Sequence, residues 1–382
     1  MNLPPLSLYI HIPWCVRKCP YCDFNSHVAG DSLDEDAYVD ALLVDLALDA
    51  PMALDRSLQS IFIGGGTPSL FTPAAIDHLL SGVREQMSQT DEIEITMEAN
   101  PGTLEADYFA GYRDAGVNRL SIGVQSFHDG SLQALGRIHK ASEAAKAVIR
   151  AKSAGFERIN LDLMFGLPQQ TIDMAIEDLQ QAIDLSVEHI SYYQLTLEPN
   201  TLFHLQPPSL PGEDQIWEIQ QAGHRLLEQS DYRHYEISAF SRPDGECRHN
   251  LNYWCFGDYL GIGAGAHAKL TRVSGIIERR WKQRQPAQYL SDISECVSLA
   301  GNRELKKSDR VIEFMMNALR LQEGVERTLF QRATGLPDNT IDEAVAEALR
   351  LELLIPDRDR LCATPLGLRF LNDLLQLFEV ND

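Results

Sequence analysis

Leu6-Ser-Leu-Tyr-Ile-His-Ile-Pro13 leads directly into Cys15-Val-Arg-Lys-Cys19-Pro-Tyr-Cys22, an apolar strand-like run followed by three cysteines at x3 and x2 spacing. Three thiolates on one loop can bind three irons of a [4Fe–4S] cube and leave the fourth iron open. Structural zinc usually needs four ligands in two pairs, and no second pair follows. The other cysteines are scattered, at Cys247, Cys255, Cys296 and Cys362. The spacing favours a cluster, with a zinc knuckle or three unrelated buried thiols as the alternatives.

The bulk composition predicts a soluble, cytoplasmic protein. Hydrophobic residues make up 44% of the chain and charged residues 23%, which is ordinary for a globular protein. Seven unpaired-looking cysteines suit a reducing compartment, and neither a signal peptide nor a membrane-length apolar run is apparent. A net charge of −22 disfavours nucleic acid and anionic lipid as direct ligands. A membrane protein stays open as a partner.

Apolar runs alternate with segments of helical periodicity over the first half of the chain, which predicts βαβ units with a parallel sheet. Six units predict an α/β fold with a partial or complete six-stranded barrel. The predicted strands are Leu6–Ile12, Ser60–Ile63, Ile93–Met97, Arg119–Val124, Arg158–Met164 and His189–Leu197. The predicted helices are Leu33–Leu48, Pro73–Met87, Leu104–Ala115, Ser142–Ala154 and Thr171–Leu185.

Polar and glycine-rich motifs follow the first five predicted strands. In parallel α/β folds the carboxyl ends of the strands converge at one mouth, so these motifs are predicted to meet there. They are the cysteine loop, Gly64-Gly-Gly-Thr-Pro-Ser69, Glu98-Ala-Asn-Pro101, Gln125-Ser-Phe127 and Gly166-Leu-Pro168. The glycine run also allows a ligand to approach the backbone closely, although a tight turn alone would explain it.

The remainder of the chain divides at a proline-rich linker, Pro207–Gly212. We predict a barrel core over 1–206, a barrel extension over 207–300 and a C-terminal region over 301–382. The extension is predicted to hold a helix and a strand, Asp214–Gln229 and Arg233–Phe240. The last region is predicted to be winged-helix-like, with elements Arg310–Leu321, Thr328–Thr334, Ile341–Leu349 and a hairpin-like Leu353–Thr364.

The cysteine motif, with Tyr21 before its last cysteine, resembles the signature of the radical S-adenosylmethionine (SAM) superfamily. The resemblance implies a [4Fe–4S] cluster on Cys15, Cys19 and Cys22, SAM on the open iron and a partial (β/α)6 barrel. It extends to the coproporphyrinogen oxidase-like family, which has a C-terminal region of the predicted kind. The SAM contacts that it implies are Tyr9, Gly65, Gly66, Thr67, Glu98, Gln125, Arg137 and Asp162. Each of these alone would pass as a turn, strand-end or packing residue.

His249-Asn-Leu-Asn-Tyr-Trp254 separates two branches of that family. A lone histidine is more often structural, yet H-N-x-x-Y-W resembles the signature of HemW-type haem chaperones, which ties His249 to haem. His27, His234 and His267 stay open as axial ligands.

Two differences from the oxidase branch concern the cluster loop and the start of the chain. Phe24 stands where the oxidases carry a further cysteine, and only fourteen residues precede Cys15. His267 replaces an apolar, adenosine-contacting residue of that branch. We therefore expect a chaperone that binds haem and delivers it to haem-requiring proteins, membrane-bound respiratory enzymes being candidates. An oxygen-independent coproporphyrinogen III oxidase and another radical SAM enzyme are the alternatives, and whether SAM is cleaved is left open.

Overall fold

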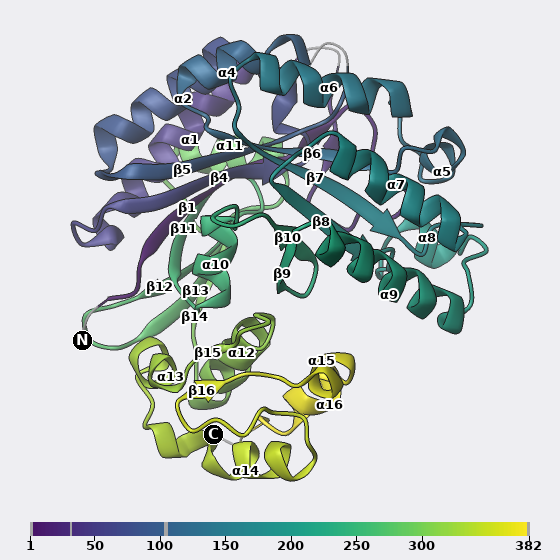
Figure 1. The fold of residues 1–382 in the computed structure, drawn as a ribbon. Helices are drawn as coiled ribbons and strands as arrows, with labels where there is room; N and C mark the ends of the chain where they lie inside the picture. The colour runs from purple at the N-terminus through teal and green to yellow at the C-terminus, as the bar shows by residue number, and fades with distance from the viewer. Residues whose placement is uncertain (1–2, 31–32, 103–105, 380–382) are drawn as a thin grey trace.

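A computed structural model describes residues 3–30, 33–102 and 106–379. A large α/β part extends to Glu304, and a smaller region of short helices ends the chain (Figure 1). Helices cover the outer face of the curved sheet, and the two parts have separate apolar cores. The arrangement agrees with the predicted fold class.

Six strands of the sheet pair in parallel and in chain order, which confirms the (β/α)6 prediction. The sheet does not close within the described residues, because further strands continue it at both edges. Apolar side chains such as Leu8 and Ile61 are fully buried, as expected of strands covered on both faces. The six are β1 (Leu6–Ile12), β4 (Leu58–Gly65), β5 (Gln89–Ala99), β6 (Arg119–Gln125), β7 (Arg158–Phe165) and β8 (His189–Gln194).

Several of the helices that connect or follow these strands begin at a side chain that caps the first turn. Thr72 and Thr171 each accept a hydrogen bond from the backbone three residues on. The helices are α1 (Glu35–Asp49), α2 (Pro73–Gln86), α4 (Phe109–Ala115), α5 (Asp129–Ala134), α6 (Ala141–Ser153), α7 (Ile172–Asp184), α8 (Leu202–Leu205) and α9 (Glu213–Gln229), with short 3-10 turns η1 (Ala50–Ala53) and η2 (Pro68–Leu70). The predicted start of α4 at Leu104 lies outside the described residues.

The prediction of one strand over Arg233–Phe240 was wrong. The segment forms two antiparallel strands, β9 (Arg233–Glu236) and β10 (Ala239–Ser241), joined by a tight turn. The turn forms backbone hydrogen bonds with two neighbouring segments. The Ile237 N–H donates to the Arg320 carbonyl at 3.1 Å, and the Tyr192 N–H of β8 donates to the Ser238 carbonyl at 2.8 Å.

Four strands after this hairpin continue the sheet on the other side of β1. The first of them, β11, pairs in parallel with β1, and the next three follow as antiparallel neighbours. These strands were not predicted from the sequence. They are β11 (Asp258–Ile262), β12 (His267–Thr271), β13 (Ile277–Trp281) and β14 (Gly301–Glu304). Helix α10 (Arg248–Trp254) precedes β11 in the chain, and α11 (Pro286–Ser294), between β13 and β14, packs on α1.

The C-terminal region has its own core around Phe314 and Phe330. The predicted hairpin is present, since the Thr364 N–H donates to the Leu353 carbonyl at 3.0 Å and the Ile355 N–H donates to the Cys362 carbonyl at 2.9 Å. The elements are α12 (Lys307–Ala318), β15 (Val325–Glu326), α13 (Arg327–Thr334), η3 (Asp338–Ile341), α14 (Asp342–Arg350), β16 (Arg360–Leu361), α15 (Pro365–Arg369) and α16 (Leu371–Gln376). Among all helices of the described residues, none has the length and apolar character needed to cross a bilayer.

Candidate functional site

The three cysteines of the motif line one cavity of about 520 Å³ at the mouth of the barrel. Their loop leaves β1 through β2 (Trp14–Cys15) and returns through β3 (His27–Val28), which pairs with it. The Cys22 N–H donates to the Cys19 carbonyl at 3.2 Å, which turns the loop back on itself. All three thiols are free and partly exposed. The loop therefore presents three sulfur ligands to one open space.

These thiols are not arranged around one shared ion. Across the described residues, no three His, Cys, Asp or Glu side chains lie close enough to share one metal ion. A cube binds each cysteine through a different iron, so its ligands are spaced more widely than those of one ion. Burial raises the pKa of Cys15 and of Cys22, so without metal both stay protonated thiols.

The same cavity brings together seven of the eight SAM contacts that the resemblance implied. Tyr9 is the exception, since it lines the neighbouring cavity. The seven are Gly65, Gly66, Thr67, Glu98, Gln125, Arg137 and Asp162. Asn100, within the predicted Glu98–Pro101 motif, also lines the cavity, as do three polar strand residues that were not predicted to do so: Ser121, Ser191 and Tyr193. Their position directly after or within the predicted strands was the available signal.

Two glycines of the loop lie too close to neighbouring groups to carry a side chain. Gly65 has φ +120°, which favours glycine, and its N–H donates to the Glu98 carboxylate at 2.9 Å. A Cβ on Gly66 would lie 2.5 Å from the backbone oxygen of Trp14. The close approach of these backbones explains why glycine is needed here.

Two partly buried carboxyl groups and one partly buried guanidinium face this cavity. Burial, with the nearby Asp162 charge, raises the pKa of Glu98 to about 8, and burial also raises the pKa of Asp162. Arg137 donates to the Asn100 side chain and to the Gly123 carbonyl, both at 2.8 Å. Its Nη1 lies 3.7 Å from Cys19 Sγ, and its buried Nε has no hydrogen-bond partner. A zwitterion with an extra cation, such as SAM, complements this set of charges.

Glu98→Gln is expected to stabilise the cofactor-free protein increasingly as pH rises. The unfolded chain ionises Glu98 near 4.5, whereas the folded chain keeps the proton until about 8. The folded state binds more protons in that window, so wild-type stability falls as pH rises through it. Glutamine does not titrate, and the gap in unfolding free energy between variant and wild type should grow by on the order of 3 kcal/mol.

Urea unfolding at about pH 5 and about pH 8 measures this gap, since those values bracket most of the window. Glu157→Gln, at an exposed position, is the matched control and should show no pH-dependent difference. If the unfolding free energies of Glu98→Gln and wild type differ by the same amount at both pH values, Glu98 does not hold its proton in the folded protein.

A second cavity, of about 630 Å³, adjoins the first. Phe24, Gly65 and Glu98 line both cavities, so ligands in the two would lie next to each other. Its lining is rich in aromatic side chains, contributed by Tyr9, Phe24, Phe62, Tyr253, Trp254, Phe256 and Tyr259. The last two residues of H-N-x-x-Y-W are therefore part of this wall.

His249, the first residue of that motif, lies inside the barrel and outside the lining described for either cavity. Its Nδ1 is 3.0 Å from Glu94 Oε1, and its ring stacks on Phe62 at 4.4 Å between centroids. Burial would raise the pKa of Glu94, but the His249 hydrogen bond and charge and the charge of Arg119 outweigh it and lower the pKa to about 2. The assignment of His249 as haem ligand stays a prediction.

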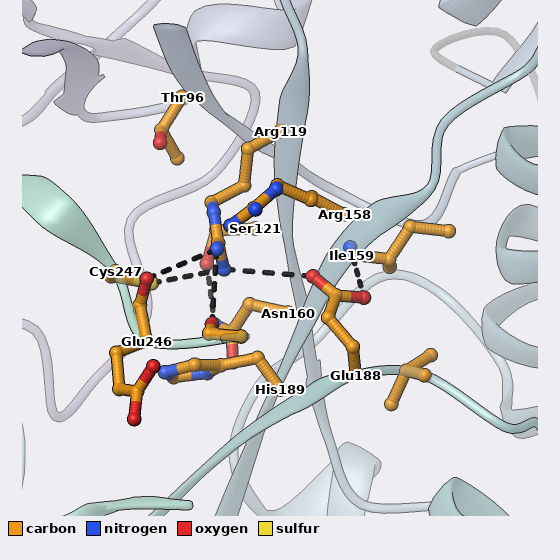
Figure 2. Close-up of polar contacts among 12 residues, drawn as sticks. Thr96, Arg119, Ser121, Arg158, Ile159, Asn160, Glu188, His189, Glu246 and Cys247 are labelled. Carbon is orange, nitrogen blue, oxygen red and sulfur yellow. Dashed lines mark hydrogen bonds and ion pairs between the residues drawn. The ribbon is translucent and has the colours of Figure 1, made fainter. Parts of the chain in front are cut away.

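A network of buried charges lies at the opposite end of the strands from the mouth. Figure 2 shows the Arg119 guanidinium reaching Glu188 and the segment before α10. It donates to Cys247 Sγ at 3.2 Å and to the Gly245 carbonyl at 3.0 Å, and its Nε is 3.0 Å from Glu94 Oε2. Arg119 thus ties β5, β6 and β8 to α10.

Comparison with known proteins agrees with this architecture. Residues 9–182 match the family model of the radical SAM superfamily, and residues 305–370 match the HemN C-terminal domain. The solved structure of coproporphyrinogen III oxidase (HemN) from Escherichia coli is similar with a TM-score of 0.83 and 25% identity, covering 99% of this chain and 91% of that one.

Full-length relatives are more similar in sequence. The heme chaperone HemW of Haemophilus influenzae is 50% identical over 99% of this chain and 98% of its own. That of Escherichia coli K12 is 50% identical over 99% of both chains. The mitochondrial radical S-adenosyl methionine domain-containing protein 1 of Mus musculus is 34% identical over 97% of this chain and 86% of its own. The chain belongs to the HemW family of heme chaperones, within the radical SAM superfamily.

Proposed function

We propose that this protein binds haem and hands it to haem-requiring proteins. The observation that carries the proposal is the position of Tyr253 and Trp254. These two residues of H-N-x-x-Y-W line an aromatic cavity of about 630 Å³, a volume within the ~300–1,000 Å³ range of small-molecule sites. Flat aromatic walls suit the faces of a porphyrin. The names of the relatives at 50% identity support the same function.

The neighbouring cavity is proposed to hold a [4Fe–4S] cluster on Cys15, Cys19 and Cys22, with SAM beside it. When bound, the cluster would supply an electron to SAM. The protein would position SAM with the glycine loop and hold its cationic groups against Glu98 and Asp162, whose raised pKa values a bound cation would lower again. Radical SAM family membership supports both cofactors.

The proposed acceptors are haem proteins, with membrane-bound respiratory enzymes among them, and the proposed location is the cytoplasm. Coproporphyrinogen oxidation is not proposed, although the fold is that of the oxidase. The relatives named as chaperones are twice as similar in sequence, and Phe24 stands where the oxidase branch carries a further cysteine.

The experiment is an anaerobic titration of the cluster-reconstituted protein with ferric haem, followed by the Soret band. We expect saturable binding that ends at a fixed haem-to-protein ratio and survives gel filtration. The same titration without SAM tests whether the adjacent ligand affects haem affinity. Haem that spreads over the gel-filtration profile without saturation would contradict the proposal.

A further inference from the structure

We propose that haem occupies the aromatic cavity with the His267 imidazole as its axial ligand and a propionate on Arg284. The inference rests on the proposed haem binding and names the residues that perform it. His267 begins β12 and Arg284 follows β13, so both lie on the part of the sheet beyond β1. Both line the cavity.

Of the imidazoles that line this cavity, only that of His267 is free among the described residues. The His11 ring is fully used, because its Nδ1 lies 2.7 Å from the Tyr9 hydroxyl and its Nε2 lies 2.8 Å from the Asn25 carbonyl. No hydrogen bond or ion pair of the described residues involves the His267 ring, and the side chain is exposed. An imidazole with both nitrogens free can turn one of them to iron.

The other histidines considered for this role lie elsewhere in the structure. His249 is buried against Glu94 and Phe62, as described above. His27 contacts the Asn25 side chain at 3.3 Å, and His234 contacts the Ile237 carbonyl at 3.2 Å on the far hairpin. None of these three lines the aromatic cavity. His249 is better placed to hold α10, and with it Tyr253, than to bind a metal in the cavity.

The surroundings of His267 favour a neutral imidazole over the protonated imidazolium. Although the side chain is largely exposed, its partial burial at the cavity wall and the charges of Arg279 and Arg284 lower the pKa of His267, so the ring is neutral near pH 7. Neutral imidazole is the form that coordinates haem iron.

Cationic groups line the same cavity, where haem propionates need partners. Arg279 is already held by Glu313 at 2.7 Å and by the Tyr259 hydroxyl at 2.7 Å, and Lys269 by Asp258 at 2.8 Å. The Arg284 guanidinium is exposed and forms no ion pair with a described residue. A guanidinium with free donors can take a carboxylate in bidentate fashion. Arg284 is therefore the cation available to a propionate.

The test compares haem binding by wild type, His267→Ala, Arg284→Gln and His249→Ala, each checked for folding by thermal unfolding. We expect His267→Ala to bind ferric haem at least about tenfold more weakly and to lose the imidazole-ligated spectrum. Free imidazole should restore that spectrum in His267→Ala. Arg284→Gln should weaken binding and leave the spectrum unchanged. His78→Ala, an exposed histidine on α2, is the matched control and should behave as wild type.

Two results would overturn the inference while leaving haem binding intact. One is an unchanged spectrum and affinity in His267→Ala. The other is loss of the imidazole-ligated spectrum in a folded His249→Ala protein with rescue by free imidazole there and not in His267→Ala. Failure of the wild type itself to bind haem would instead overturn the proposed function on which the inference rests.

Discussion

Cys15→Ala, Cys19→Ala and Cys22→Ala are each expected to abolish the brown thiolate-to-iron absorption of the anaerobically reconstituted protein. Each cysteine would bind a different iron, so two remaining thiolates hold a cube poorly and it is lost. All three side chains lie on the loop at the mouth and are only partly buried. The unfolding free energy of the cofactor-free variants should therefore stay within about 0.5 kcal/mol of wild type. Iron and sulfide analysis with the visible spectrum measures the loss.

Cys296→Ala is the matched control, because Cys296 is an exposed free cysteine and lies outside the lining of the cluster cavity. It should retain full iron, sulfide and colour. A Cys19→Ala protein that keeps wild-type iron content would show that the x3 and x2 motif does not hold the cluster.

Arg119→Met is expected to destabilise the barrel by about 3–5 kcal/mol, because it removes the arginine charge that faces the buried Glu94 and the partly buried Glu188. Arg119 is fully buried and lies 3.0 Å from Glu94 and 3.5 Å from Glu188. Methionine fills much of the volume but supplies no donor to the Gly245 carbonyl or to Cys247. The whole free energy of unfolding of a typical protein is about 5–15 kcal/mol, so this loss is large. The urea midpoint of the transition measures it.

Arg150→Met is the matched control for this loss. The exposed Arg150 forms an ion pair with Asp107 at 2.7 Å, and exposed pairs contribute at most about 1 kcal/mol. The double variant Arg119→Met with Glu94→Gln should recover part of the lost stability, since it also removes the negative charge of Glu94 that Arg119 no longer faces. An Arg119→Met protein as stable as Arg150→Met would contradict a buried network at this end of the barrel.

The six barrel strands were predictable from sequence because parallel strands covered on both faces are continuous apolar runs. The strands β11 to β14 were not, because they carry buried charges that break the apolar pattern. Lys269 of β12 is buried against Asp258, and Lys282, directly after β13, is buried against Asp45 and Asp49. The partners of Lys282 lie more than 200 residues away in the chain, and no local pattern reveals such a pair.

The cluster loop and the first cavity were largely predictable, because the carboxyl ends of parallel strands meet at one mouth. The second cavity was not, since its wall combines β1, α10 and β12. The direction of His249 depends on the rotation of α10 about its own axis, which Glu94 on β5 decides through its hydrogen bond. A helix of seven residues carries too little periodicity to show that rotation in its sequence.

The central claim is that this chain carries haem and does not oxidise a porphyrinogen. The most direct test runs the anaerobic haem titration in parallel with a coproporphyrinogen III turnover assay that contains SAM and a reductant. The account predicts saturable haem binding and no loss of propionate carboxyl groups from coproporphyrinogen. Turnover of coproporphyrinogen without stable haem binding would contradict it and would identify the protein as an oxidase.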